Sequence, residues 1–195
     1  MVRLISMYRI SQLFIWLRRM HHSRGFGIQS PNDYGFIRYV VNEHYPYYAY
    51  ADLEKELPDI SRRQRKLCRL YFRMANYCQA HTIVDCSPTC EAYRRYFQAG
   101  CHRSRIQDAV TAVSHIELLR VAVDACDQTM VSRVLDRVDE RSVVLVEGIR
   151  RSKKAKAVWK AIYGHEKVGV SFDLHDVGIL FFDPKRYKQH YIINF

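Results

Sequence analysis

The apolar positions of this chain follow two different periods, which alternate along its central part. Short runs rich in valine, isoleucine and leucine, typical of buried strands, occupy 82–85, 118–124 and 142–148. Apolar residues spaced three and four apart, typical of one face of a helix, occupy 61–79, 88–98 and 152–164. This alternation predicts an α/β fold around a mostly parallel sheet.

The C-terminal part has a different pattern. Apolar stretches at 168–174, 177–182 and 191–195 predict strands joined by short connections. His175 and Asp176 suit a hairpin turn between the first two of these strands. We therefore expect an antiparallel strand pair at this end of the sheet.

The first 60 residues predict helices. Residues 4–20 combine helical spacing with scattered arginines, and such a basic amphipathic helix packs on its own domain or on a second copy more often than on a membrane. Ser30 and Pro31 suit the cap and the first position of a further helix. We expect a helical extension at 1–60, packed on an α/β domain at 61–195. A homodimer is compatible with this arrangement.

Length and composition indicate one globular core. The chain has 195 residues, of which 48% are hydrophobic and 26% charged. Because no apolar run approaches about 18 residues, and arginines interrupt the first 20, we expect neither a membrane span nor a signal peptide. We expect a cytoplasmic protein with reduced, buried cysteines. A zinc site drawn from Cys86, Cys90, Cys101 and His102 is less favoured, since the usual Cys-x-x-Cys pair is absent.

The positive charge raises the question of an anionic partner. The formal net charge is +11, and 22 of the 31 basic residues are arginine, whose planar fork suits phosphate and carboxylate. The helix at 61–79 and the cluster at 150–156 are the candidate surfaces for nucleic acid. The same basic residues can also form solvated helix faces that bind no anionic partner, and we favour that interpretation for the helix.

Candidate chemistry lies after the first central strand, which ends in Asp85 and is followed by a tight turn and a helix. An open α/β sheet binds nucleotide-type cofactors at this kind of position. Glycine normally lets the backbone of such a turn approach the ligand and donate N–H groups to it. Here the turn holds Ser87, Pro88, Thr89 and Glu91 instead. The sequence predicts a cofactor-type scaffold with an altered cofactor loop.

Several segments carry a family resemblance, namely those at 24–34, 143–162, 170–174, 178–182 and 188–195. Together with the element order, they resemble class I S-adenosylmethionine-dependent methyltransferases, in particular a group of small bacterial members known mainly from Bacteroidetes. The resemblance implies a Rossmann-like methyltransferase sheet, mostly parallel with an antiparallel C-terminal strand pair, plus N-terminal helices. It also implies S-adenosylmethionine as cofactor and methyl transfer to an oxygen or nitrogen of a small-molecule acceptor.

The resemblance assigns roles around the first strand. Asp85 matches the acidic residue at its end, but the glycines expected two and six positions later are Ser87 and Glu91. A carboxylate at Glu91 would repel the carboxylate of the cofactor, and Pro88 lacks an N–H donor. Together these changes would weaken cofactor binding by on the order of 2–4 kcal/mol.

The second family strand is expected at 103–107, so that Asp108 matches the acid that holds the cofactor's ribose. The span from there to 118 is too short for a full helix–strand–helix, so we expect one strand of the usual sheet to be shortened or lost. The candidate cofactor-binding residues are Asp85, Ser87, Thr89, Asp108 and Asp124.

Metal-dependent relatives bind magnesium or calcium through acids after the fourth and fifth strands, and Asp124 and Glu147 match these positions. The family pairs the second acid with an amide, whose place is taken by Gly148, so no metal site is predicted. His175 and His115 are possible bases, but chance placement explains them equally well, and the catalytic residue stays unassigned.

Two functions remain open from the sequence. One is a methyltransferase with weakened or lost cofactor binding. The other is a catalytically inactive protein of the same fold, which serves as a binding or dimerisation module and would contact nucleic acid through its arginine-rich helices.

Overall fold

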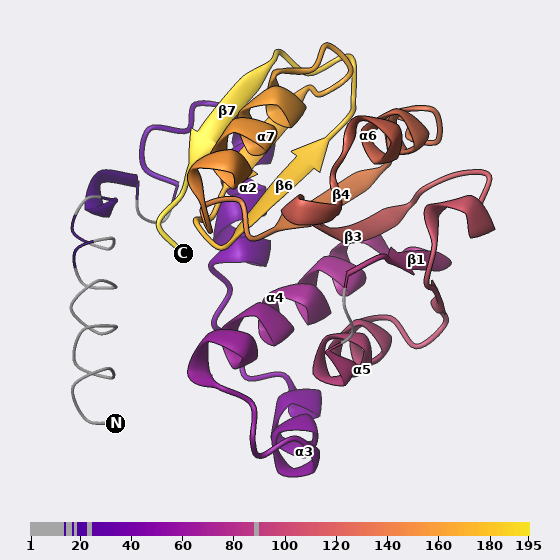
Figure 1. Ribbon diagram of the computed structural model, residues 1–195. Coiled ribbons are helices and arrows are strands. Elements are labelled where there is room, and N and C mark those ends of the chain that lie inside the picture. The colour runs from indigo at the N-terminus through magenta and orange to yellow at the C-terminus, as the bar shows by residue number, and fades with distance from the viewer. Residues whose placement is uncertain (1–13, 15–16, 18, 23–24, 88–89) are drawn as a thin grey trace.

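A computed structural model describes residues 14, 17, 19–22, 25–87 and 90–195 of the chain. Their strands form one sheet in the order β2-β1-β3-β4-β6-β5-β7 (Figure 1). The strands are β1 (Thr82–Asp85), β2 (Arg105–Gln107), β3 (Leu118–Ala122), β4 (Val143–Glu147), β5 (Val170–Asp173), β6 (Val177–Phe181) and β7 (Gln189–Ile192). Strands and helices alternate up to β5, as the two apolar periods predict.

The sheet is mostly parallel. Strands β2, β1, β3 and β4 pair in parallel, whereas β6 is antiparallel to both β4 and β5. His175, with a φ of 76°, and Asp176 lie in the tight connection between β5 and β6, which confirms the expected hairpin. The architecture is Rossmann-like α/β, as expected. The last strand, β7, adds to β5 in parallel, because the connection after β6 carries the chain back to the starting end of β5.

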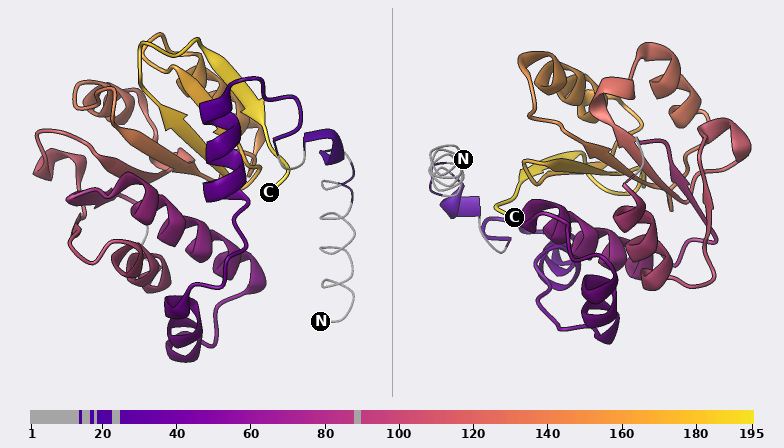
Figure 2. Two further views of the ribbon diagram at one scale, coloured as in Figure 1. Left: turned by 180° about the vertical axis from the view of Figure 1, so that it is seen from behind. Right: turned by 60° about the horizontal axis from the view of Figure 1, so that its bottom comes forward.

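Helices cover both faces of the sheet, which gives three layers (Figure 2). One apolar core lies between the sheet and helices α2, η2, α3, α4 and α5, and a second lies on the opposite face under α6 and α7. The helices are η1 (Met20–His22), α2 (Pro31–Phe36), η2 (Ile37–Val41), α3 (Tyr48–Glu56), α4 (Arg62–Cys78), α5 (Glu91–Gly100), η3 (Val110–Ala112), η4 (Val123–Ala125), α6 (Gln128–Leu135) and α7 (Lys153–Gly164).

The predicted helix starts are confirmed by their caps. The Ser61 hydroxyl accepts from the Gln64 amide, and the Gln64 side chain accepts from the Ser61 amide, which forms a complete capping box on α4. Ser152 caps α7 and Ser30 caps α2 in the same way, each through its hydroxyl.

The α-helix that starts at Pro31 ends at Phe36, and the chain continues from Ile37 as the π-helix η2. The carbonyls of Val40 and Val41, at its end, accept hydrogen bonds from the buried guanidinium of Arg73 on α4, at 2.6 and 3.0 Å. Arg73 thereby satisfies carbonyls that a helix end leaves without intrahelical partners.

Some boundaries differ from the sequence prediction. Strand β3 ends at Ala122, so Asp124 lies beyond it in the short helix η4. Helix α5 begins at Glu91 and ends at Gly100. Between β2 and β3 the only regular element is η3, so no strand lies in that connection.

Most of the amphipathic segment expected at 4–20 lies outside the described residues. Among those described, Arg19 is buried and contacts the C-terminal strands. No helix in the described part of the chain is long and apolar enough to cross a bilayer.

Candidate functional site

The carboxyl ends of β1, β3 and β4 meet at one edge of the sheet. The strand order reverses between β1 and β3, since the chain moves from β1 to β2 on one side and returns to β3 on the other. Open α/β sheets bind ligands in the crevice at such a reversal. In this protein, Asp85 of β1 and Arg120 of β3 are direct partners in the strand register at that point.

Arg120 fills this crevice. Its side chain is fully buried and donates from Nε and Nη2 to the two carboxylate oxygens of Asp85, at 3.0 and 3.1 Å. Its Nη1 lies 3.1 Å from Glu147 Oε2, at the end of β4. The guanidinium carbon lies 4.6 Å from the ring centre of Tyr93 and 5.6 Å from that of Tyr71, as in cation–π pairs.

The guanidinium of Arg120 stays protonated and positively charged. Burial alone lowers the pKa of the guanidinium, but Glu147, Tyr71 and Asp85 outweigh burial, and the net effect raises this pKa. Burial, aided by Glu147, raises the pKa of Tyr71 well above its usual value, so the Tyr71 hydroxyl stays protonated and donates to Glu147. A closed network of compensated charges therefore occupies the crevice.

A second arginine covers the outer side of Asp85. Arg94 of α5 places its Nε 3.4 Å from Asp85 Oδ2, and its Nη2 donates to Asp108. Arg94 therefore bridges the two acids that the family resemblance assigns to the cofactor. The Asp108 side chain is 77% exposed and lies just past β2.

Of the other predicted cofactor residues that the structure describes, Ser87 contacts Asp85, while Asp124 has a different partner. The Ser87 amide donates to Asp85 at 3.3 Å, and the buried Ser87 hydroxyl has no hydrogen-bond partner among the described residues. Thr89 lies outside the described residues. Asp124 is 59% exposed and pairs with Arg151 at 2.7 Å.

The two acids considered for a metal are also held apart by arginines. Asp124 pairs with Arg151, while Glu147 contacts Arg120 and Tyr71. Within the described residues, no cluster of three potential ligands of the histidine, cysteine, aspartate or glutamate type occurs. Of the possible bases, His115 lies 3.6 Å from Asp139, near the opposite ends of the strands.

A cavity of about 460 Å³ opens beside the filled crevice, at the carboxyl end of β4. We call it the β4 cavity. It is lined by the start of α4, the end of β4 with the residues after it, and the β5–β6 turn. The lining residues are Ser61, Arg63, Gln64, Leu67, Tyr93, Glu147, Gly148, Arg150, Arg151, His175 and Asp176.

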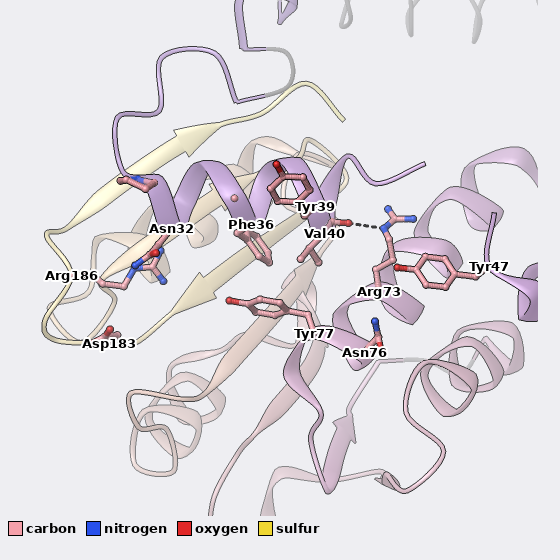
Figure 3. Close-up of a pocket in the computed structure, with 12 residues that line it drawn as sticks. Asn32, Phe36, Tyr39, Val40, Tyr47, Arg73, Asn76, Tyr77, Asp183 and Arg186 are labelled. Carbon is pink, nitrogen blue, oxygen red and sulfur yellow. Dashed lines mark hydrogen bonds between the residues drawn. The ribbon is translucent and has the colours of Figure 1, made fainter. Parts of the chain in front are cut away.

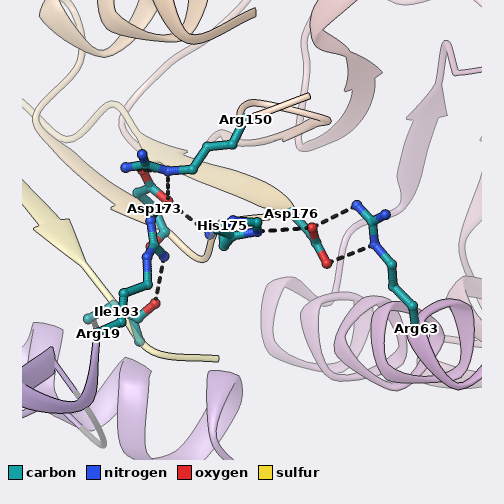
Figure 4. Close-up of polar contacts among 7 residues, drawn as sticks. All are labelled: Arg19, Arg63, Arg150, Asp173, His175, Asp176 and Ile193. Carbon is teal, nitrogen blue, oxygen red and sulfur yellow. Dashed lines mark hydrogen bonds and ion pairs between the residues drawn. The ribbon is translucent and has the colours of Figure 1, made fainter. Parts of the chain in front are cut away.

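Ion pairs organise the wall of the β4 cavity (Figure 4). The Arg63 fork donates to both oxygens of Asp176, at 2.8 and 2.7 Å, and His175 Nδ1 lies 3.2 Å from the same carboxylate. Behind this wall, Asp173 accepts from Arg150 at 2.9 Å and from Arg19 at 2.7 Å. Each of these carboxylates therefore has two basic neighbours.

These basic partners lower the pKa values of Asp173 and Asp176. Burial alone raises the pKa of Asp173, but hydrogen bonds from Arg150 and Arg19 outweigh burial, so the pKa is lower than usual. The pKa of Asp176 is also lowered: burial opposes the shift, while His175 and Arg63 produce it. Both groups are carboxylates at neutral pH.

The lowered pKa of Asp173 predicts a loss of stability in acid. A carboxylate whose folded pKa lies below its unfolded value, about 3.9, contributes stability above that value and loses it as the pH falls through the folded pKa. In urea unfolding, Asp173→Asn is therefore expected to lose less stability than wild type when the pH is lowered from neutral through this range. Asp52→Asn, at an exposed acid paired with Lys55, is the control and should follow wild type. An unchanged acid dependence in Asp173→Asn would contradict the assignment.

A larger and more open cavity of about 610 Å³ lies between α2, η2 and the C-terminal half of α4 (Figure 3). Phe36, Tyr39 and Tyr77 line it, and the last two are half exposed or more. Its arginines are occupied, since Arg73 holds the end of η2 and Arg186 pairs with Asp33. This cavity has aromatic walls, and both of its arginines are already engaged.

The residues that sequence reasoning missed are Arg120 and Arg94. Arg120 is the single charged residue within the apolar run of β3, and an unusual residue of this kind is the signal that could have identified it. Arg94 lies on the polar side of a helix with strong apolar periodicity and carries no such signal.

Comparison with known proteins assigns no family. No family model, curated protein or solved structure matches this chain.

Proposed function

We propose that this chain is a methyltransferase-like protein whose cofactor crevice has become a structural ion-pair network, and that it acts as a non-catalytic binding protein. The observation that carries this proposal is the place of Arg120. It lies at the reversal of strand order, fully buried, with both oxygens of Asp85 as its acceptors.

The chemistry of the cofactor supports this proposal. S-adenosylmethionine carries a sulfonium and an ammonium group, so a cofactor in the crevice would bring positive charge next to the Arg120 guanidinium. Like charges at short distance and low dielectric repel strongly. Asp85, which the family would use at this point, already accepts two hydrogen bonds and faces Arg94. The residues present therefore do not fit this cofactor.

The alternative, an active methyltransferase, is favoured by one observation. The hydroxyl of Ser87 is buried beside Asp85 and lacks a hydrogen-bond partner among the described residues. Buried polar groups normally have partners, so this hydroxyl would suit a ligand atom. We give this less weight, because a methyltransferase would also have to displace Arg94 from Asp85 and Asp108.

The proposal predicts that the cofactor does not stabilise the protein. A ligand at 100 times its dissociation constant adds about 2.7 kcal/mol to the free energy of unfolding, which raises the melting temperature measurably. Millimolar S-adenosylmethionine, or S-adenosylhomocysteine, whose sulfur is an uncharged thioether, is expected to leave the melting temperature unchanged. A clear rise with either compound would disprove the proposed function.

A further inference from the structure

We propose that the β4 cavity binds the phosphate group of a small phosphorylated ligand through Arg63, Arg150 and Arg151. This inference rests on the proposed role as a binding protein and names the ligand chemistry of that role. Arg63 belongs to α4, while Arg150 and Arg151 follow each other in the connection after β4, and all three line one cavity of about 460 Å³. This volume falls in the usual range for small-molecule sites.

The surroundings of the cavity carry excess positive charge. Arg62 follows the cap of α4, and Lys153 and Lys154 follow the cap of α7. All three are exposed, and none forms an ion pair with another described residue. These unpaired cations lie within three residues along the chain of residues that line the cavity.

This charge distribution opposes helix stability. The N-terminus of a helix has a partial positive charge, which favours acidic residues in the first turn and disfavours basic ones. The first turns of both α4 and α7 contain no acid. Local rules of this kind are most often broken where function requires it. A bound anion in the β4 cavity would relieve this conflict at α4, whose cap Ser61 and first residues line the cavity.

The three arginines can turn toward a ligand at low cost. If Arg150 leaves Asp173, that carboxylate keeps Arg19. The other pairs lie nearer to solvent: Asp124 and Arg151 are 59% and 64% exposed, so water can replace the interaction.

Arg63 can also leave its carboxylate at low cost. When it leaves Asp176, the carboxylate retains His175 Nδ1 at 3.2 Å, and the Arg63 side chain is itself 51% exposed. Figure 4 shows that Arg63 and Arg150 approach the β5–β6 turn from opposite sides. A single guanidinium fork can donate two parallel N–H bonds to one phosphate, which is the bidentate geometry in which arginine binds phosphate.

The lining favours a small ligand over a nucleic acid strand. Single-stranded nucleic acid is normally held by aromatic side chains on which its bases stack. Two rings line the cavity: His175, whose Nδ1 contacts Asp176, and Tyr93, which is only 8% exposed because its ring packs against Tyr71 and Arg120. The cavity therefore offers charge for phosphate and little stacking surface for bases.

Calorimetric titration of the full chain with inorganic pyrophosphate at low ionic strength tests the inference. We expect saturable binding, and a loss of about tenfold or more in affinity for Arg151→Gln, since a charge-assisted hydrogen bond is removed. Arg150→Gln is expected to act in the same direction. Arg141→Gln is the matched control: Arg141 is exposed and precedes β4 at the opposite end of the strand, so its loss should leave the affinity unchanged.

The outcomes separate this inference from the proposed function. Absence of pyrophosphate binding, or an equal loss in Arg141→Gln, overturns the phosphate site. Binding of a mixed single-stranded oligonucleotide much more tightly than pyrophosphate overturns the assignment to a small ligand. The melting temperatures of both cavity variants check that they are folded. Stabilisation by S-adenosylmethionine with pyrophosphate binding and its loss in Arg151→Gln intact would contradict the proposed function alone, although Glu147 and Tyr93 border both the crevice and the β4 cavity.

Discussion

Arg120→Leu is expected to destabilise the protein by about 3–5 kcal/mol, which is the typical result of removing one partner from a buried ion pair. The leucine would leave the carboxylate of Asp85, which is fully buried, without its two hydrogen bonds from Arg120. Glu147 would lose the cation that faces its Oε2. Urea unfolding at neutral pH measures the change in the free energy of unfolding.

Two further variants test whether the loss of stability in Arg120→Leu comes from the ion-pair network. Arg105→Leu removes an exposed arginine from the edge strand β2 and should change stability by no more than about 0.5 kcal/mol. Adding Asp85→Asn and Glu147→Gln to Arg120→Leu should recover much of the loss, since no charge then remains buried without a partner. A loss below about 1 kcal/mol in Arg120→Leu would show that these carboxylates can find other partners or water.

The sequence predicted the scaffold because the scaffold depends on local patterns. Apolar runs of four to seven residues define β1, β3 and β4, and the caps Ser61 and Ser152 define the starts of two helices. The β5–β6 hairpin follows from two apolar runs separated by a short turn at His175 and Asp176. All of these signals come from residues close together in the chain.

The contacts at the crevice could not be predicted in the same way. Arg120 and Asp85 are 35 residues apart and meet only because β1 and β3 are neighbours with a particular register. Asp85 was correctly placed at the end of the first strand, but its position alone does not reveal whether a ligand or an arginine binds it. The same holds for Arg94, whose side chain reaches Asp108 only after α5 has packed beside β1.

The two proposals share one physical basis. An arginine in the crevice compensates Asp85 and Glu147, so these acids need no cationic ligand. At the β4 cavity the balance is reversed, because each carboxylate that pairs with Arg63, Arg150 or Arg151 has a second partner or faces water. Positive charge is buried and compensated at the first place and available at the second. Ligand binding is therefore expected where the arginines can leave their partners.

Gly100→Ala is expected to destabilise the protein by about 1–3 kcal/mol, the typical cost of forcing an extra carbon into a packed core. A Cβ at Gly100 would lie 2.2 Å from the carbonyl oxygen of Phe72 and 3.0 Å from the Cβ of Ala75. Because the carbonyl belongs to the backbone of α4, it cannot move aside as a flexible side chain would. The α4–α5 pair would have to separate, and the tyrosines that pack against Arg120 come from these two helices.

Gly164→Ala is the matched control for this variant. Gly164 ends α7 as Gly100 ends α5, but a Cβ there would meet no atom within 4 Å. Alanine stabilises a helix interior by up to about 1 kcal/mol relative to glycine, so this control should be neutral or slightly stabilising in urea unfolding. Equal effects of the two substitutions would mean that α4 and α5 are not in close backbone contact. A loss of stability in Gly100→Ala but not in Gly164→Ala would show that the packing of α4 against α5 supports the Arg120 network.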